Sequence, residues 1–243
     1  MNEIWQTLAQ RAGSELSAQQ DASFWRYIDL LLEANQRMNL TRIDSRDAAA
    51  VGHVGDALTL LPFLPTGAIK LADVGSGGGI PGIPLAIARP DISVTLFEST
   101  QKKAAFLKDA AQELQLSNVT VIAQRAEDLA RSGQSQIANR ESQIRESFDV
   151  VTARALAEMN VLVEWCMPLV KVGGKLLAMK GGKIATELPA ASRAIKLIGG
   201  GEPRVHPAEL PGADYHVIVE VEKIFRTGLK YPRETATIRQ KLL

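Results

Sequence analysis

The sequence predicts an α/β protein in which a parallel β-sheet follows an N-terminal helical extension. Three observations support this prediction. From residue 69 onward, short apolar segments alternate with segments of helical spacing, which is the pattern of parallel strands joined by crossover helices. The first apolar segment runs directly into a glycine-rich turn, IKLADVGSGGGIPGIP at 69–84. Before that turn, apolar residues recur at helical spacing.

Residues 1–66 are predicted to form the helical extension, packed on a core formed by residues 67–243. Ser17 and Gln20 have the spacing of a capping box at a helix N-terminus. The apolar residues that follow at helical spacing are Phe24, Ile28, Leu31, Leu32 and Met38. A second helix is predicted from Asp44 to Leu61, where prolines stop it.

The core elements follow in alternation. Strands are predicted at 69–74, 92–98, 119–123, 148–153 and 175–180, and helices at 82–89, 101–115 and 156–170. The run at 215–224 has the half-exposed alternation of a strand that pairs antiparallel. The polar segment Arg131–Ser147 predicts an exposed insertion.

The glycine-rich turn indicates a ligand, because a turn without side chains lets a ligand reach bare backbone. Gly77, Gly79 and Gly82 satisfy the G-x-G-x-x-G dinucleotide pattern, and Glu98 follows about 20 residues later, where a ribose-binding acid is expected. A nicotinamide-dependent reductase is therefore one interpretation. A tight strand-to-helix turn without any ligand is another.

A second register of the same turn, Asp73-x-Gly75-x-Gly77-x-Gly79, resembles the first motif of S-adenosylmethionine-dependent methyltransferases. Asp73 favours this register. Its carboxylate suits the cationic ammonium and sulfonium of S-adenosylmethionine, whereas it would repel a pyrophosphate.

Polar residues at the ends of the predicted strands are expected to meet in one cleft, because ligands bind outside the carboxyl ends of parallel strands. These residues are Asp73, Glu98, Arg125, Arg154 and Lys180. Glu98 is placed to bind both hydroxyls of a ribose. The segment from Arg125 to Glu127 is expected beside the adenine, although it also fits the start of a solvated helix.

The residues favour an acceptor with a free lone pair, such as a ring nitrogen of a purine. The chain lacks the Asn/Asp-Pro-Pro-aromatic motif used on exocyclic amines, and Cys166 lies in an apolar helix typical of a core. Arg154, Lys180 and Arg233 are candidate cations for phosphate or guanine edges. Asn39 and Thr41, with Asp56, are expected on the acceptor side or as helix caps.

Charge and composition limit the classes of partner that the sequence predicts. The net charge of +1 gives no general attraction to nucleic acid, but Lys223–Leu243 holds six basic residues and one acidic residue. This tail predicts either a solvated terminus or an RNA contact, so a noncatalytic RNA-binding factor is a further alternative. The three histidines lack metal-ligand spacing, and no metal is predicted. No apolar run reaches the roughly 20 residues of a membrane span, and a cytoplasmic location is expected.

Eight motifs together carry a specific resemblance. They are MNLT (38–41), HVGD (53–56), DVGSGGGIPGIPLAI (73–87), FESTQKKAAFL (97–107), RAED (125–128), TARA (152–155), MKG (179–181) and KYPR (230–233). In these motifs and their order, the chain resembles the bacterial small-subunit ribosomal RNA guanine-N7 methyltransferases, also called the glucose-inhibited division protein B family. The likeness covers nearly all of the chain.

This resemblance implies a Rossmann-like class I methyltransferase sheet and methylation of N7 of the guanine at position 527, in the 530 loop of 16S rRNA, with S-adenosylmethionine as cofactor. The implied partner is 16S rRNA or the small ribosomal subunit, with no membrane and no obligate protein partner. N7 carries no proton, so the reaction needs no general base.

The resemblance also assigns site residues. Those implied to contact the cofactor are Gly75, Ile80, Glu98, Ser99, Thr100, Ala126, Glu127 and Arg154, to which the loop pattern adds Asp73, Gly77 and Gly79. Those implied to face RNA are Asn39, Arg125, Lys180 and Arg233. Of all these, Arg154, Lys180 and Asn39 are predicted at the reaction centre.

Overall fold

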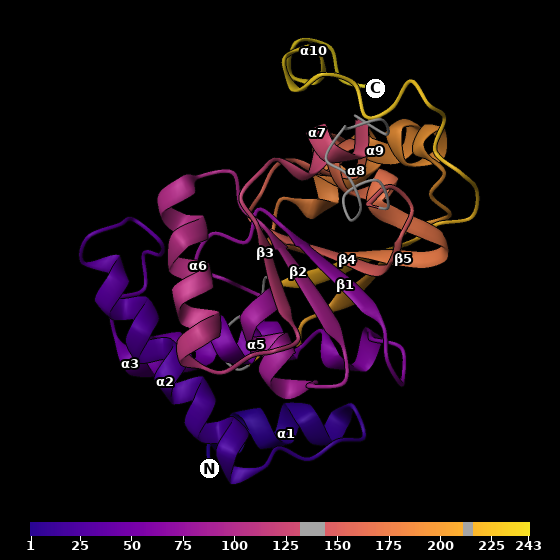
Figure 1. The fold of residues 1–243 in the computed structure, drawn as a ribbon. Helices are drawn as coiled ribbons and strands as arrows, with labels where there is room; N and C mark the ends of the chain where they lie inside the picture. The colour runs from indigo at the N-terminus through magenta and orange to yellow at the C-terminus, as the bar shows by residue number, and fades with distance from the viewer. Residues whose placement is uncertain (132–143, 211–215) are drawn as a thin grey trace.

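A seven-stranded sheet organises the chain, with the order β3-β2-β1-β4-β5-β7-β6 (Figure 1). The computed structural model describes residues 1–131, 144–210 and 216–243. The parallel strands are β1 (Lys70–Val74), β2 (Ser93–Phe97), β3 (Val119–Ile122), β4 (Phe148–Arg154) and β5 (Val170–Lys180). The last two strands, β6 (Arg204–Pro207) and β7 (Val217–Glu222), pair antiparallel, with β7 next to β5. The predicted antiparallel pairing of the last run is confirmed.

Helices cover both faces of the sheet, so neighbouring residues of one strand enter different cores (Figure 1). Leu71 packs into a core shared with α2 (Ala18–Asn35), α5 (Gly82–Ala88) and α6 (Gln101–Glu113), and Ala72 packs into the opposite core. The opposite core is shared with α7 (Ala126–Arg131), α8 (Met159–Cys166) and α9 (Ile184–Ile198). The strands are therefore apolar on both sides, as parallel strands in a three-layer fold are.

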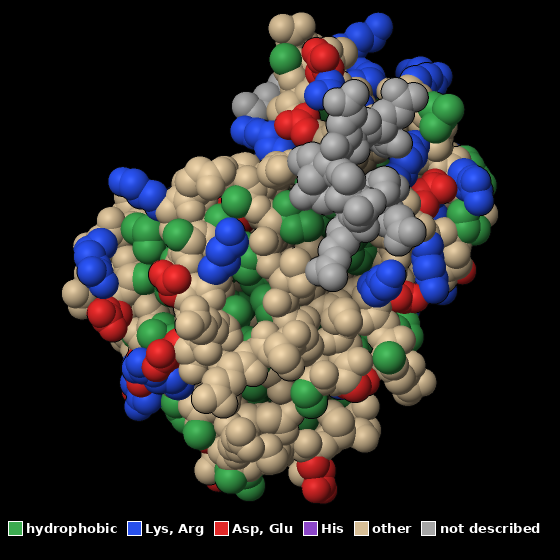
Figure 2. All heavy atoms as spheres, in the orientation of Figure 1, with side chains coloured by type: hydrophobic (Ala, Val, Ile, Leu, Met, Phe, Trp, Pro, Cys, Tyr) green, Lys and Arg blue, Asp and Glu red, His purple; other side chains and the backbone are tan. Residues whose placement is uncertain are grey.

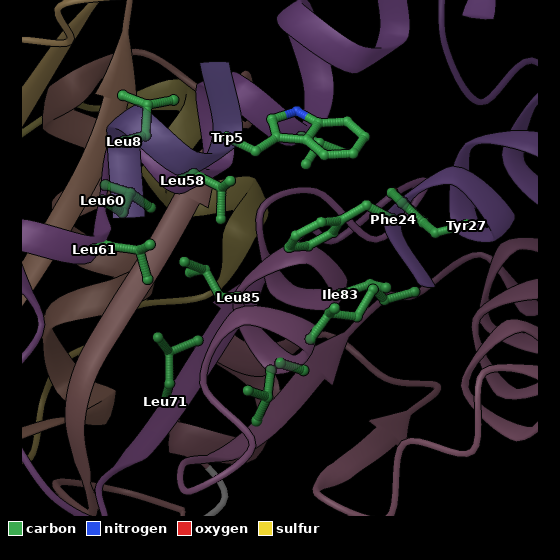
Figure 3. Packing of buried hydrophobic residues seen from close by; sticks show 14 of the residues in the cluster. Trp5, Leu8, Phe24, Tyr27, Leu58, Leu60, Leu61, Leu71, Ile83 and Leu85 are labelled. Carbon is green, nitrogen blue, oxygen red and sulfur yellow. The ribbon is translucent and has the colours of Figure 1, made fainter. Parts of the chain in front are cut away.

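The N-terminal helices pack on the α5 side of the sheet (Figure 3). Helix α1 (Glu3–Arg11) places Trp5 against Phe24 of α2, with ring centroids 5.1 Å apart. The predicted capping box of Ser17 and Gln20 is present at the start of α2. Because these side chains share one hydrophobic cluster with the strands, no packing gap marks the predicted boundary at residue 66, and that division stays a prediction.

The helix predicted from Asp44 to Leu61 is interrupted. It consists of α3 (Arg46–Ala49), a π-helical turn (Ala50–Gly55) and α4 (Asp56–Leu58), and a 3₁₀ turn follows at Leu61–Phe63. A π-helical turn adds a residue to the helical repeat, which shifts the direction of the side chains that follow. Here it brings the carbonyl of Gly52 to the sheet edge, where that carbonyl accepts a hydrogen bond from Arg154.

Other elements differ from the sequence prediction. The helix predicted at 156–170 is shorter, because Pro168 lies in a 3₁₀ turn and β5 already starts at Val170. The sequence predicted neither α9 nor β6. Most of the predicted insertion Arg131–Ser147 lies outside the described residues. None of the helices among the described residues is both long and apolar enough to cross a membrane.

Two cations attach the C-terminal segment to the rest of the fold. Lys223 is fully buried, and its Nζ donates hydrogen bonds to the carbonyl of Met167 and the hydroxyl of Thr227 at 2.6 and 2.5 Å. Burial lowers the pKa of Lys223 to about 8. Arg145 donates to the carbonyls of Thr227 and Tyr231. Lys223 belongs to the predicted basic tail. Its ammonium group is nevertheless buried and hydrogen-bonded within the molecule, so it is not a surface cation.

Candidate functional site

A cleft opens where the strand order changes direction, beyond the carboxyl ends of β1 and β4. Strand β2 lies on one side of β1, and β4 lies on the other. The loops that follow β1 and β4 therefore run to opposite sides and leave a space between them. They enclose a space of about 370 Å³, which we call the glycine-loop hollow. Its walls come from the glycine-rich turn, the end of β2, residues 124–127, the residues after β4, and Leu40, Thr41, His53 and Trp165.

The glycine-rich turn has the backbone conformation that only glycine adopts easily. Gly75 and Gly77 have φ values of +74° and +55°. A Cβ added to Gly77 would meet only the carbonyl of Gly75, at 3.9 Å, so this stretch of backbone borders open space. The buried hydroxyl of Tyr27 donates to the carbonyl of Gly78 at 2.8 Å and fixes the turn from behind. Tyr27 is a supporting residue that the sequence did not indicate.

Asp73 lies behind the turn rather than in the hollow. It is fully buried, and its Oδ2 accepts a hydrogen bond from the backbone N–H of Gly82 at 3.1 Å. The hydroxyl of Thr152 lies 3.5 Å from Oδ1. Asp73 therefore does not lie where it was expected to contact a cationic ligand. Its side chain instead contacts the start of α5 and a residue of β4.

We expect Asp73 to make stability depend on pH. Burial raises its pKa from 3.8 to about 7, so between these values the folded protein holds a proton that the unfolded chain has lost. This contribution to the free energy of unfolding is complete below about pH 4 and is lost as pH rises through 7. Asp73→Asn keeps an oxygen for the Gly82 N–H without a titrating group. Urea unfolding from pH 4.5 to 8 should give a flatter decline in the variant, and equal slopes would contradict the assignment.

Glu98 connects the turn to the next helix. Its side chain is buried, with Oε2 accepting from the N–H of Gly77 at 3.0 Å and Oε1 from the N–H of Thr100 at 2.7 Å. Glu98 and Ser99 line the hollow, as does Ile80. Thr100 does not line it, and Gly79 faces the side chains of α5 and α6 instead. The predicted set is therefore brought together only in part.

The segment after β3 closes the far end of the hollow. Arg125, Ala126 and Glu127 all line it. Glu127 is buried and accepts a hydrogen bond from the hydroxyl of Thr235 at 3.2 Å, while Arg125 lies half-exposed with Nη1 3.4 Å from the same carboxylate oxygen. Trp165 of α8 also lines the hollow, and its indole nitrogen is buried with no hydrogen-bond partner among the described residues. Trp165 was not predicted as a lining residue, because it lies in an apolar helix typical of a core.

Arg154, the last residue of β4, lies between two hollows. Its Nη2 donates to the carbonyl of Gly52 at 3.0 Å, and its Nη1 lies 3.2 Å from Oδ2 of Asp56. Asp56 is buried, and its Oδ1 lies 3.1 Å from Nδ1 of His216. His53 lies beside the same site with Nε2 2.8 Å from the hydroxyl of Thr41; burial and the charge of Arg154 lower its pKa to about 4. His53 is therefore neutral at neutral pH.

The second space, which we call the β5 hollow, has a volume of about 340 Å³. Arg154 and Ala155 line it and the glycine-loop hollow alike. Lys180, at the end of β5, lines the β5 hollow, donates to the carbonyl of Ala157 at 2.9 Å and pairs with Glu187. Arg154 and Lys180 thus both line the β5 hollow, which shares Arg154 and Ala155 with the glycine-loop hollow, instead of the single cleft that was predicted.

Two predicted RNA-facing residues lie apart from both hollows. Asn39 is exposed in the loop after α2, next to the lining residues. Arg233 makes hydrogen bonds from Nε and Nη2 to the carboxylate of Glu164, at 2.9 and 2.7 Å, and the Glu164 side chain is 1% exposed. The guanidinium of Arg233 is therefore engaged inside the fold. Lys and Arg side chains gather at this end of the molecule, near α10 (Thr235–Gln240; Figure 2).

In the part of the chain that the structure describes, no three His, Cys, Asp or Glu side chains gather as metal ligands would. Two solved structures share this fold. The crystal structure of M. jannaschii TYW2 in complex with AdoMet matches with a TM-score of 0.52 and 17% identity, covering 75% of this chain and 80% of that one. The ribosomal protein L11 methylase from Lactobacillus delbrueckii subsp. bulgaricus matches with a TM-score of 0.51 and 13% identity, covering 72% and 79%. The predicted class I methyltransferase fold is confirmed.

Closer relatives share the whole chain. The ribosomal RNA small subunit methyltransferase G of Lactobacillus johnsonii is 40% identical over 99% of both chains. That of Chloroflexus aggregans is 42% identical over 91% of this chain and 89% of its own. The family model described as "GidB: rRNA small subunit methyltransferase G" matches residues 20–211, which include every residue assigned to the two hollows except His216, Val217 and Ile218. The chain belongs to the rRNA small subunit methyltransferase G (GidB) family.

Proposed function

We propose that this protein transfers a methyl group from S-adenosylmethionine to N7 of a guanine in 16S rRNA, at position 527 in the 530 loop. The observation that carries the proposal is the place of Arg154, between a hollow bordered by bare glycine backbone and a second, cation-lined hollow. A methyl donor and its acceptor need such adjoining sites. The small ribosomal subunit is the proposed substrate particle, and the cytoplasm the proposed location.

The glycine-loop hollow suits S-adenosylmethionine chemically. The open space beside Gly77 admits the amino-acid end of the cofactor against backbone, and Glu98 supplies carboxylate oxygens for ribose hydroxyls. Ala126 and Glu127 would lie beside the adenine. The unpartnered indole N–H of Trp165 is a buried donor that a bound ligand is able to satisfy.

When bound, S-adenosylmethionine supplies a methyl group on a positively charged sulfonium, which a lone pair attacks in line. The task of the protein is then alignment and exclusion of water. Arg154 is held from two sides, by Gly52 and Asp56, so its position is set before the acceptor arrives. N7 of guanine loses no proton, so the transfer itself needs no base.

Gly77→Ala tests the cofactor site, with Gly67→Ala as its matched control. Both glycines have positive φ, +55° and +77°, and in both cases an added Cβ meets no neighbour closer than 3.9 Å. Each substitution should therefore cost about 1–2 kcal/mol of stability through backbone strain. Only Gly77→Ala adds a methyl group to the hollow, and we expect it alone to weaken S-adenosylmethionine binding by at least about tenfold, measured by calorimetry. Equal binding by the two variants would contradict the placement.

The function itself is tested by methyl transfer from labelled S-adenosylmethionine to small-subunit particles that lack the modification, followed by nucleoside analysis. We expect label in 7-methylguanosine. Naked 16S rRNA in a parallel assay determines whether the assembled particle is required. Cofactor binding without transfer to either substrate would overturn the proposed acceptor.

A further inference from the structure

Polar atoms in the β5 hollow differ in whether they already have partners. Asp56 is paired with two side chains: Oδ2 forms an ion pair with Nη1 of Arg154 at 3.2 Å, without a hydrogen bond, and Oδ1 lies 3.1 Å from Nδ1 of His216. Glu187, in the first turn of α9, is engaged at one oxygen only. Its Oε2 pairs with Lys180 and accepts the backbone N–H of Met159 at 3.1 Å. Its Oε1 has no hydrogen-bond partner among the described residues, although the side chain is only 17% exposed.

A carboxylate oxygen that lines a hollow and has no donor within the protein is a place for a ligand N–H, because an ionised carboxylate can only accept hydrogen bonds. The rest of the hollow suits a flat base. Its walls include the apolar side chains of Met179, Val217 and Ile218, and its volume of about 340 Å³ lies at the small end of the range for ligand sites, about 300–1,000 Å³.

The chemistry of guanine fits this distribution of atoms, given the proposed function. If N7 points toward the glycine-loop hollow, the neighbouring O6 lies on the same edge, next to Arg154, which lines both hollows. The opposite edge, with the N1–H and N2–H₂ donors, then points into the β5 hollow. Adenine has an amino group in place of O6 and no N–H at N1. Its amino donor would therefore face the Arg154 cation, and its N1 acceptor would face the Glu187 carboxylate, so neither pair could form a hydrogen bond.

We propose that Glu187 is the residue that selects guanine, by accepting hydrogen bonds from N1–H and N2–H₂ with its free Oε1. The inference rests on the proposed function, since it names the base-recognising group of the same site. Asp56 then has another task, holding Arg154, and contributes no base contact.

The test compares particles carrying guanosine or inosine at the target position, since inosine keeps N7, O6 and N1–H but lacks the N2 amino group. For the unaltered protein we expect kcat/KM to be about 10-fold to 100-fold lower on inosine, the range for a hydrogen bond to a charged group. In Glu187→Gln this ratio should fall to near one. Asp56→Asn, the matched control, should lower the rate on both substrates and keep the ratio.

The outcomes separate the two proposals. If the unaltered protein methylates no guanosine particle at N7, the proposed function fails. If it methylates guanosine and inosine particles equally, or if Glu187→Gln binds S-adenosylmethionine and keeps the full preference for guanosine, the role of Glu187 is overturned. The inosine comparison with the unaltered protein keeps the inference testable even when the variant does not fold.

Discussion

Arg154→Ala is expected to lower methyl transfer by at least about 100-fold, the usual loss when a group that aligns the reacting atoms is removed. The variant should also lose stability. Asp56 is buried and would keep only His216 as a partner, and removing one member of a buried ion pair costs about 3–5 kcal/mol. Single-turnover methyl transfer and denaturant unfolding measure the two losses separately.

The double variant Arg154→Ala/Asp56→Asn separates alignment from stability. Without the buried charge of Asp56, most of the lost stability should return, whereas transfer should stay low and S-adenosylmethionine binding should change less than transfer does. A folded double variant that turns over at a near-normal rate would remove Arg154 from the reaction centre.

Arg233→Ala is expected to lower the free energy of unfolding by about 3–5 kcal/mol, because it leaves the buried carboxylate of Glu164 without a cation and with only the backbone N–H of residue 233 as a partner. This expectation differs from that of an RNA contact, whose loss would weaken binding and reduce the salt dependence of affinity by about one counterion. Urea unfolding and RNA titration at several salt concentrations measure both quantities.

Two further variants make this comparison decisive. Arg233→Met/Glu164→Leu removes both charges and should recover stability, as replaced buried ion pairs often do. Lys230→Ala removes an exposed neighbouring cation and should leave stability nearly unchanged. If the double variant is stable but binds RNA with a reduced salt slope, Arg233 is an RNA contact after all.

The strand pattern and the glycine turn were predictable because both are local. Each parallel strand is a short apolar run, and the turn that follows β1 needs glycine at the positive φ values of Gly75 and Gly77. From these, the sheet edge and most of the hollow lining follow by topology. The direction of Asp73 does not follow. A strand apolar on both faces carries no alternation that tells which side its single carboxylate faces.

The missed features depend on long-range contacts or on local signals that oppose the structure. Helix α9, which carries Glu187, contains Pro189, a residue that normally argues against a helix. Strand β6 is short, largely exposed and ends in Pro207. The π-helical turn at Ala50–Gly55 has no sequence signature. Arg233 pairs with the carboxylate of Glu164, 69 positions away in the chain, and no pattern in the sequence indicates that the two residues meet.

The change of strand direction between β1 and β4 has a consequence for how the protein is made. Thr152 and Asp73, which face each other there, are 79 positions apart. A chain still being synthesised has its glycine turn long before β4 is available to complete the cleft. A ligand that binds only the finished cleft adds its binding energy to the completed fold alone, and none to a partly synthesised chain. The cofactor can therefore protect the mature enzyme against unfolding, whereas a chain that has not yet reached β4 folds without that contribution.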